Sequence, residues 1–107
     1  MYKNMSMIDV KKQAIVEGIC RAAQQTPIVE KVIIFGSTAR KECTDDSDVD
    51  ICYVLSCDTR NLDVYNLSRK TSKICDHNCD IFFYDLIGSN LKSEIDRTGV
   101  VVYESKS

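Results

Sequence analysis

Two short patterns between residues 36 and 50 contain residue types suited to phosphate chemistry. Gly36-Ser37 directly follows residues 32–35, an apolar run typical of a buried strand. A glycine at a strand end lets an anion approach the backbone, and the N–H groups of the turn that follows are free to bind it. Asp48 and Asp50 are two positions apart, so on a strand their carboxylates project from one face. The segment therefore predicts a divalent metal platform beside a phosphate loop.

A third carboxylate, Asp80, begins another apolar stretch. If that stretch pairs with a strand over residues 49–55, Asp80 joins Asp48 and Asp50 and a second ion can bind. Oxygen ligands of this kind suit Mg²⁺, which is usually held by one or two carboxylates together with substrate phosphates. Two ions roughly 3.5–4 Å apart stabilise both the attacking and the leaving oxygen in phosphoryl transfer. We therefore predict Asp48, Asp50 and Asp80 to be metal ligands and catalytic residues.

Three other interpretations of this segment are weaker. An EF-hand loop starting at Asp46 requires a glycine and a glutamate where Ile51 and Cys57 stand. A Walker A loop is excluded because no Lys-Ser or Lys-Thr follows a second glycine. A solvated acidic turn over residues 45–50 does not account for the Gly-Ser pair at a strand end. The metal platform remains the favoured interpretation.

The elements that must position these residues can be predicted from hydrophobic periodicity. A first helix of about four turns begins at the capping box Ser6-x-x-Asp9 and continues until Pro27. Four segments rich in β-branched and aromatic residues are predicted strands, over residues 32–35, 49–55, 79–84 and 100–103.

Two further helices are predicted between and after these strands. One covers residues 61–75, with Leu62, Tyr65 and Leu67 as candidate buried positions. The other ends at Gly99, and its buried face is marked by Ile87, Leu91 and Ile95. Alternating helices and strands indicate an α/β (α+β) fold, with a small mixed sheet of about four strands flanked by helices.

Composition is that of a globular domain. At 107 residues, with 44% hydrophobic and 28% charged residues, the chain is expected to form a single domain over residues 1–107. A net charge of −2 and a pI near 5.3 argue against an extended nucleic-acid surface. The first twelve residues contain no long apolar run, so neither a signal peptide nor a membrane anchor is expected, and we expect a cytoplasmic protein.

Six cysteines would suggest disulfides in a secreted protein, but nothing in the sequence directs secretion, so reduced thiols are expected. Cys75, His77 and Cys79 lie within five residues and form a possible zinc site. No second ligand pair of matching spacing follows them. The pattern favours a turn with buried thiols, in which His77, the only histidine, is an exposed turn residue.

The phosphate and metal patterns together resemble the Gly-Ser-x10-Asp-x-Asp signature of the DNA polymerase β-like nucleotidyltransferase superfamily. Gly36, Ser37, Asp48 and Asp50 fill all of its fixed places. The local sequence patterns Gly-Ser-x-Ala-Arg and Ser-Asp-x-Asp-Ile are similar to those of the minimal nucleotidyltransferases, the smallest members of this superfamily. Cys79-Asp80-Ile81 is similar to the strand that carries the third aspartate, so the resemblance extends over nearly the whole chain.

The resemblance implies a role for each matching residue. Gly36 and Ser37 would hold the phosphates of an NTP, with Ser37 a ligand rather than a nucleophile because no base adjoins it. Asp48 and Asp50 would bind both Mg²⁺ ions, and Asp80 would complete the second metal site and help the acceptor hydroxyl lose its proton. Arg40 is a candidate for a phosphate contact, although an arginine here could equally lie on the surface.

The resemblance also implies a reaction, in which a hydroxyl attacks the α-phosphorus of an NTP and releases pyrophosphate. ATP is the expected NTP. Larger relatives hold the acceptor with a further domain. Here we expect that a partner protein either holds the acceptor or is itself the acceptor. Many small members are antitoxins paired with a HEPN-type toxin, and some transfer AMP to a tyrosine of that toxin. The alternatives are an antibiotic-type transferase that acts on small molecules as a homodimer, and a non-catalytic module that masks a partner surface.

Overall fold

The computed structural model describes residues 2–40, 48–56 and 62–105, and in these residues four strands form one mixed sheet of order β3-β2-β1-β4. β1 is antiparallel to both β2 and β4, whereas β2 and β3 are parallel. The strands are β1 (Val29–Phe35), β2 (Val49–Leu55), β3 (Cys79–Phe83) and β4 (Val100–Glu104). All four predicted strands are therefore present, and β1 begins three residues earlier than expected.

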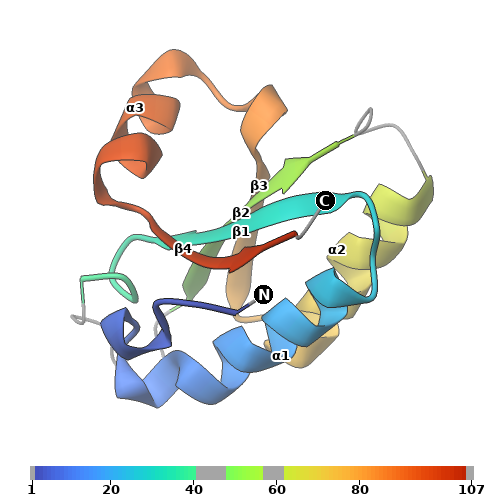
Figure 1. Ribbon diagram of the computed structural model, residues 1–107, viewed down its shortest axis with the longest axis horizontal. Helices are drawn as coiled ribbons and strands as arrows, with labels where there is room; N and C mark the ends of the chain where they lie inside the picture. The colour runs from blue at the N-terminus through green and yellow to red at the C-terminus, as the bar shows by residue number, and fades with distance from the viewer. Residues whose placement is uncertain (1, 41–47, 57–61, 106–107) are drawn as a thin grey trace.

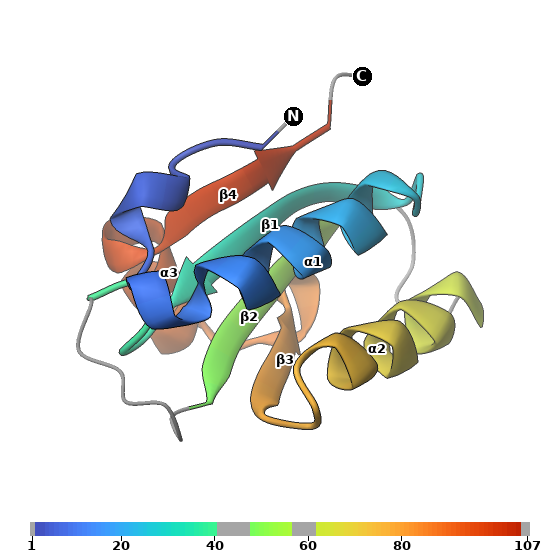
Figure 2. The same cartoon turned by 90° about the horizontal axis from the view of Figure 1, so that it is seen from below.

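Helices cover both faces of this sheet (Figures 1 and 2). The helices α1 (Gln13–Gln24) and α2 (Leu62–Ile74) pack on one face, and α3 (Ser89–Thr98) packs on the other. Three short 3-10 helices complete the described structure: η1 (Met5–Met7), η2 (Val10–Lys12) and η3 (Tyr84–Leu86). The predicted α+β fold is confirmed. Within the described residues, no helix combines the length and the apolar character needed to cross a lipid bilayer.

The predicted start of the first helix is wrong. No capping box forms at Ser6, because Ile8 is fully buried with extended backbone angles and interrupts the helical pattern. The Asp9 carboxylate instead accepts a hydrogen bond from the Lys11 backbone N–H at 3.0 Å, which caps the short η2 turn. Local side-chain bonding of this kind competes with helix formation. Regular α-helix begins only at Gln13.

The predicted buried face of α2 is partly wrong. Leu67 is buried as expected, but Leu62 and Tyr65 are 70% and 59% exposed. The buried positions are Val64, Leu67 and Thr71, whose spacing of three and four places them on one side of a helix. Val64 and Thr71 are thus buried in place of Leu62 and Tyr65, and the polar Thr71 carries no hydrophobic signal for burial.

Thr71 is tolerated in the core because its hydroxyl has two partners. It donates a hydrogen bond to the Leu67 carbonyl at 2.8 Å, and it lies 2.6 Å from the hydroxyl of the buried Tyr53. With the Thr71 proton directed to Leu67, the Tyr53 hydroxyl donates to Thr71 Oγ1. The pair therefore joins α2 to β2 through a fully satisfied polar contact.

We expect Thr71→Val to lower the free energy of unfolding by about 1–3 kcal/mol, because it leaves the Tyr53 hydroxyl buried without a partner. Urea denaturation measures the loss. The matched control is the double variant Tyr53→Phe/Thr71→Val, which removes both hydroxyls and should be more stable than Thr71→Val alone. Equal stability of Thr71→Val and the unmodified protein would contradict this account.

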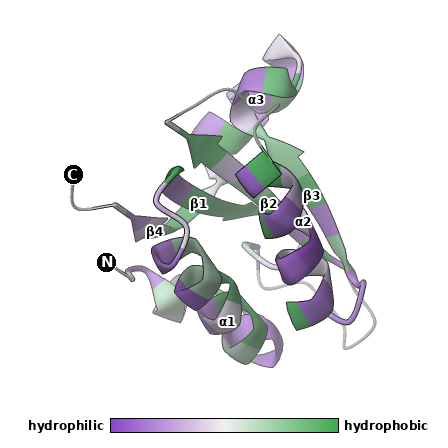
Figure 3. Ribbon diagram, turned by 90° about the vertical axis from the view of Figure 1, so that its right-hand side faces the viewer, coloured by the Kyte–Doolittle hydropathy of each residue, from purple (hydrophilic) through white to green (hydrophobic). Residues whose placement is uncertain are grey.

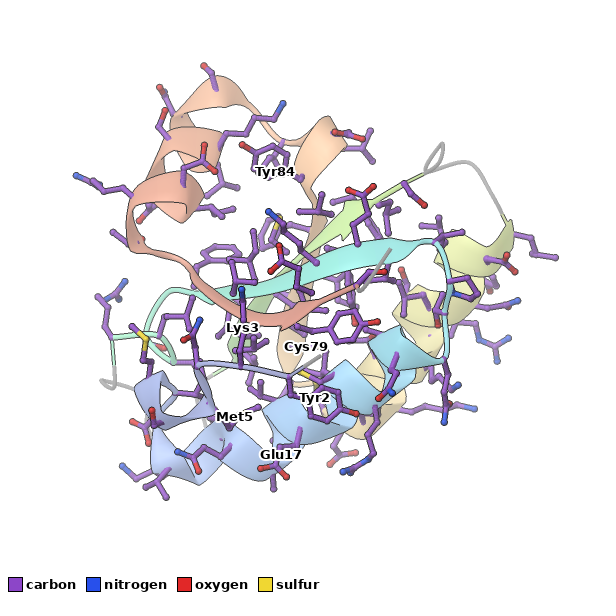
Figure 4. The ribbon with its side chains drawn as sticks, in the orientation of Figure 1. Tyr2, Lys3, Met5, Glu17, Cys79 and Tyr84 are labelled. Atoms are coloured by element: carbon purple, nitrogen blue, oxygen red, sulfur yellow. The ribbon has the colours of Figure 1, made fainter. Side chains whose placement is uncertain are left out.

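The segment before α1 lies along β4, as Figure 4 shows for Tyr2 and Lys3. Tyr2 forms a bridge with Tyr103, and the Lys3 backbone N–H donates to the Val102 carbonyl at 2.9 Å. The Lys3 ammonium also pairs with the Glu104 carboxylate at 2.7 Å. This edge of the sheet is therefore covered by the chain itself.

Candidate active site

Asp50 and Asp80 lie side by side on neighbouring strands. They are direct register partners in the parallel pair of β2 and β3. Asp50 is flanked by Val49 and Ile51, which are buried in the cluster beneath α1 and α2. Because side chains alternate along a strand, Asp50 and Asp80 both project from the opposite face, on which α3 packs. The strand pairing on which the expectation for Asp80 depended is therefore present, since β3 lies beside β2.

The surroundings of Asp50 disfavour its negative charge. Phe35 is its register partner on β1, and the Phe35 and Phe82 rings lie 5.4 Å apart on the same face of the sheet. Burial raises the pKa of Asp50 to about 6, and the adjacent Asp80 carboxylate contributes through both its charge and a hydrogen bond to Asp50. Two carboxylates this close are stabilised either by a shared proton or by a cation between them.

Gly36 provides the space for this carboxylate pair. Its φ of 73° lies in the left-handed region, which a residue with a side chain rarely adopts. A Cβ atom built on Gly36 would also collide with the Asp50 carboxylate. We expected glycine here because a phosphate must approach the backbone. The structure adds a second reason: the Asp50 side chain already occupies the space above Gly36.

The turn after Gly36 carries the other predicted phosphate ligands. The Arg40 backbone N–H donates to the Gly36 carbonyl at 3.1 Å, so the chain makes one helical turn there, with Ser37 half-buried inside it. The Arg40 side chain is exposed, and its positive charge opposes the rise in the pKa of Asp50. Arg40 therefore lies close enough to act on the charge of the carboxylate pair, although it is on the surface.

The position of Asp48 differs from the one predicted, which was on the same strand as Asp50. Asp48 is exposed and lies one residue before β2, not on the strand. Its charge also raises the pKa of Asp50, but by less than that of Asp80. In the part of the chain that the structure describes, no three His, Cys, Asp or Glu side chains are close enough to hold a metal ion as they stand. The structure brings Asp50 and Asp80 together, and the three-carboxylate metal site stays a prediction.

Sequence reasoning missed the contribution of Thr38 to this site. Thr38 is fully buried beneath the turn, and its carbonyl accepts a hydrogen bond from the Asp9 backbone N–H at 3.2 Å. The segment before α1 is thereby fixed to the turn that carries Gly36. Thr38 Oγ1 has no hydrogen-bond partner among the described residues. A threonine in a polar stretch gives no sequence signal for such burial.

The possible zinc ligands lie in the turn between α2 and β3. Asp76 and His77 adopt left-handed angles, with φ of 51° and 64°, and the His77 side chain is exposed. Cys75 and Cys79 point instead into the cluster beneath α1 and α2, where burial raises the pKa of Cys75 to about 12. Figure 4 shows Cys79 on the α1 side of the sheet and Tyr84 towards α3. That this turn binds no zinc stays a prediction.

Comparison with known proteins identifies the family. Residues 17–107 match the family described as "Polymerase beta, Nucleotidyltransferase". The chain belongs to this family. No match was found among curated protein sequences. The carboxylate pair of Asp50 and Asp80 is thus the candidate active site of a nucleotidyltransferase domain.

Several solved structures share this nucleotidyltransferase fold. A toxin-antitoxin complex with AMP-PNP contains a chain similar at TM-score 0.71 and 18% identity, over 84% of this chain and 73% of that one. A complex of a tri-AMPylated HEPN toxin from Shewanella oneidensis with an MNT antitoxin matches at TM-score 0.66 and 16% identity, over 91% and 75%. The MntA-HepT toxin-antitoxin complex matches at TM-score 0.59 and 16% identity, over 91% and 73%. At these identities the likeness shows the fold alone.

The residues of this nucleotidyltransferase fit the divalent ion that the family resemblance implies. Asp50 and Asp80 supply the oxygen ligands that Mg²⁺ prefers, and in the absence of a cation, burial together with the charge of Asp80 raises the pKa of Asp50. Asp48 adds a third carboxylate nearby that is open to solvent. The donor set is hard and oxygen-only, which disfavours zinc.

Proposed function

We propose that this protein transfers a nucleoside monophosphate from an NTP to a hydroxyl group, with AMP as the transferred group and Mg²⁺ as the metal. The single observation that carries the proposal is the pairing of Asp50 with Asp80 directly above Gly36. A phosphate held at the Gly36 turn would lie next to the carboxylates, and the metal ions held by those carboxylates would offset its negative charge. Membership of the nucleotidyltransferase family supports this chemistry.

Each residue has a defined part in the proposed reaction. The turn over Gly36 and Ser37 binds the triphosphate through its backbone N–H groups and the serine hydroxyl. Asp48, Asp50 and Asp80 would hold two Mg²⁺ ions, which would supply positive charge to offset that of the α-phosphate and of pyrophosphate. The acceptor oxygen forms a bond to the α-phosphorus as the bond to the leaving pyrophosphate breaks. Asp80, on the exposed edge strand, is placed to accept the acceptor proton.

Arg40 has a supporting part in this scheme. Its guanidinium is exposed beside the carboxylate pair and acts on the charge of Asp50. A planar cation in this place is suited to hold a phosphate oxygen of the leaving group. We propose Arg40 as a phosphate ligand and not as a proton donor, because guanidinium groups remain protonated.

The proposed acceptor is a hydroxyl on a partner protein, a HEPN-type toxin, so that transfer neutralises the partner. The support is that chains of similar fold occur in toxin-antitoxin complexes, one with AMP-PNP and one with a tri-AMPylated HEPN toxin. Exposure of Asp48 and Asp80 also leaves the site open to a large acceptor. A partner tyrosine suits such a site because its phenol has a pKa near 10, well below that of an aliphatic alcohol.

The test is to incubate the protein with Mg²⁺, labelled ATP and the protein encoded by the adjacent gene. We expect the partner to gain the mass of one or more AMP residues, and we expect no gain in EDTA. Intact-mass spectrometry measures the gain, and peptide mapping locates the modified side chain. Labelling of a small hydroxyl compound in place of the partner would support an antibiotic-type transferase instead. Tight binding and inhibition of the partner without any mass gain, whichever NTP is supplied, would support masking and contradict the proposal.

A further inference from the structure

The outer side of α2 carries interface-type residues that the core does not use. Leu62, Tyr65, Arg69 and Lys73 are all exposed, and their spacing of three and four residues places them in one stripe along the helix. Figure 3 views the molecule from this side, where most of the α2 ribbon has the hydrophilic colour. Tyrosine and arginine are enriched in the parts of protein surfaces that bind other proteins. We call these four residues, with Lys70, the α2 stripe.

None of the ion pairs found among the described residues involves Arg69, Lys70 or Lys73, although Asp63 carries one negative charge in the first turn of the same helix. The ion pairs found among the described residues both involve Glu104, at the opposite edge of the sheet. Lys70 donates a hydrogen bond to the neutral Gln25 side chain at 3.3 Å, and the Arg69 guanidinium lies 5.8 Å from the centre of the Tyr65 ring. In a chain with a net charge of −2, this leaves a local cluster of cations on one helix.

Two surface hollows adjoin these cations. A hollow of about 510 Å³ lies between the end of α1 and α2. Three cations, Arg69, Lys70 and Lys73, line it against one carboxylate, Asp63. A second hollow of about 330 Å³ is also lined by Arg69 and Lys73. The α2 stripe is therefore flanked by concave surface on both sides of the helix and can receive side chains.

The second hollow lies at the end of α2 that connects to the edge strand β3. His77 lines it, in the turn that connects α2 to β3. Asp80 is three residues further along the chain, on the edge strand of the sheet. The turn at His77 thus joins the end of α2 to the start of the edge strand that carries Asp80. Because Asp80 projects from the other face of the sheet, a ligand lying along α2 reaches the carboxylate pair only by passing around this edge. This placement connects the cationic surface to the reaction proposed above.

We propose that the α2 stripe docks an acidic segment of the acceptor protein and so presents its hydroxyl to Asp80. This inference rests on the proposed function. Carboxylates of the segment pair with Arg69, Lys70 and Lys73, and an apolar side chain packs against Tyr65 or Leu62. The docking surface selects the acceptor, because the residues at the active site contact only the NTP and a single hydroxyl.

An acidic protein segment suits this surface better than a nucleic acid. The cations lie along the C-terminal half of one helix of 13 residues, roughly 20 Å long, which is short for tracking a phosphate backbone. The protein as a whole is negatively charged, which repels a long polyanion but tolerates a short acidic segment. The exposed Leu62 and Tyr65 also provide apolar contacts that a peptide can use.

The test measures binding without metal or NTP, so that docking can fail while transfer activity stays intact. A fluorescent glutamate-rich peptide that contains one tyrosine is titrated with the full-length protein, next to the same peptide with glutamine in place of glutamate and a single-stranded RNA of equal length. We expect the acidic peptide to bind most tightly. The double variant Arg69→Glu/Lys73→Glu should weaken its binding about tenfold or more, because two attractive contacts become repulsive.

The matched control is Lys92→Glu/Arg97→Glu, which makes the same change of charge on α3, across the sheet. It should retain the affinity for the acidic peptide. With Mg²⁺ and ATP, the α2 variant should have a raised KM for the tyrosine peptide but keep its affinity for ATP. Equal binding of the acidic and glutamine peptides, tighter binding of the RNA, or an equal loss in both double variants would each overturn the proposal. Normal peptide docking with no nucleotide transfer would instead contradict the proposed function.

Discussion

Replacing Asp50 with asparagine is expected to abolish nucleotide transfer while preserving the fold. Asp50 is the carboxylate that lies both beside Asp80 and above Gly36, so its loss removes a ligand of the metal at the place where the phosphate would bind. Metal-ion stabilisation of a phosphoryl transition state amounts to several kcal/mol, which corresponds to a loss of about 10³-fold or more in kcat/KM. Transfer of labelled AMP measures the loss, and circular dichroism checks the fold.

The same variant should be more stable than the unmodified protein when metal is absent. The pKa of Asp50 rises from 3.8 to about 6 on folding, so the folded state binds the proton more tightly than the unfolded state. The stability contributed by that proton is fully present below about pH 4 and is lost as pH rises through about 6. Above about pH 7 the folded protein carries an ionised Asp50 that burial disfavours, and Asp50→Asn removes this unfavourable charge. We expect the free energy of unfolding to rise by about 1–2 kcal/mol, a value lowered from that of a fully buried group because solvent screens the half-exposed carboxylate.

Asp85→Asn provides the control, because Asp85 is an exposed carboxylate in η3 and not part of the carboxylate pair. It should change neither activity nor stability in EDTA. Asp48→Asn should lose activity like Asp50→Asn, but with a smaller gain in stability, since Asp48 is exposed and acts on Asp50 less than Asp80 does. Normal transfer by Asp50→Asn would show that the active site lies elsewhere.

Gly36→Ala is expected to damage both stability and activity. The substitution places a side chain at a φ of 73° and drives a methyl group into the Asp50 carboxylate. Backbone strain of this kind costs about 1–3 kcal/mol, and the forced movement of Asp50 adds to it, so we expect a loss of about 2–4 kcal/mol in unfolding free energy. Displacing Asp50 by roughly 1 Å should also lower kcat about 10²-fold, since transfer depends on alignment. Urea denaturation and labelled transfer measure the two effects.

Gly88→Ala is the matched control for this substitution. Gly88 precedes α3 with a φ of −75°, and a Cβ built there meets no atom within 4 Å. Its replacement should change stability by less than about 0.5 kcal/mol. If Gly36→Ala behaved like Gly88→Ala, the close packing of Asp50 on the turn would not be a feature of the protein in solution.

The fold could be predicted from the sequence where hydrophobic periodicity was unambiguous. The strand that ends at Phe35 and the helix that carries Ile95 were both expected, because uninterrupted apolar runs and regular spacing leave few alternatives. The start of α1 could not be predicted, because a capping pattern at Ser6 competed with burial of Ile8 in an extended segment. The buried face of α2 was misplaced because its apolar residues lie on more than one side of the helix, and because Thr71 is held in the core by a hydrogen bond to another element.

The sequence predicted the parts of the candidate site that are close together along the chain, but not the parts that depend on contacts between distant residues. Gly36, Asp48 and Asp50 are close in sequence, so their spacing alone indicated the chemistry. The adjacency of Asp80 depended on which strands pair, and the register of β2 and β3 provides it. The burial of Thr38 beneath the turn depends on a contact with Asp9, more than twenty positions away, which no local pattern contains. The cationic stripe of α2 could not be predicted either, because the sequence did not show which side of this helix faces the solvent.

The most direct test of the proposed mechanism is anomalous diffraction from crystals grown with Mn²⁺, as a substitute for Mg²⁺, and a non-hydrolysable ATP analogue. The mechanism predicts two anomalous peaks roughly 3.5–4 Å apart, in contact with Asp48, Asp50 and Asp80, with the triphosphate against the turn at Gly36 and Ser37. It also predicts that the α-phosphate faces the exposed edge of β3. Metal peaks away from these carboxylates, or a nucleotide bound elsewhere on the sheet, would contradict the assignment of this site as the catalytic centre.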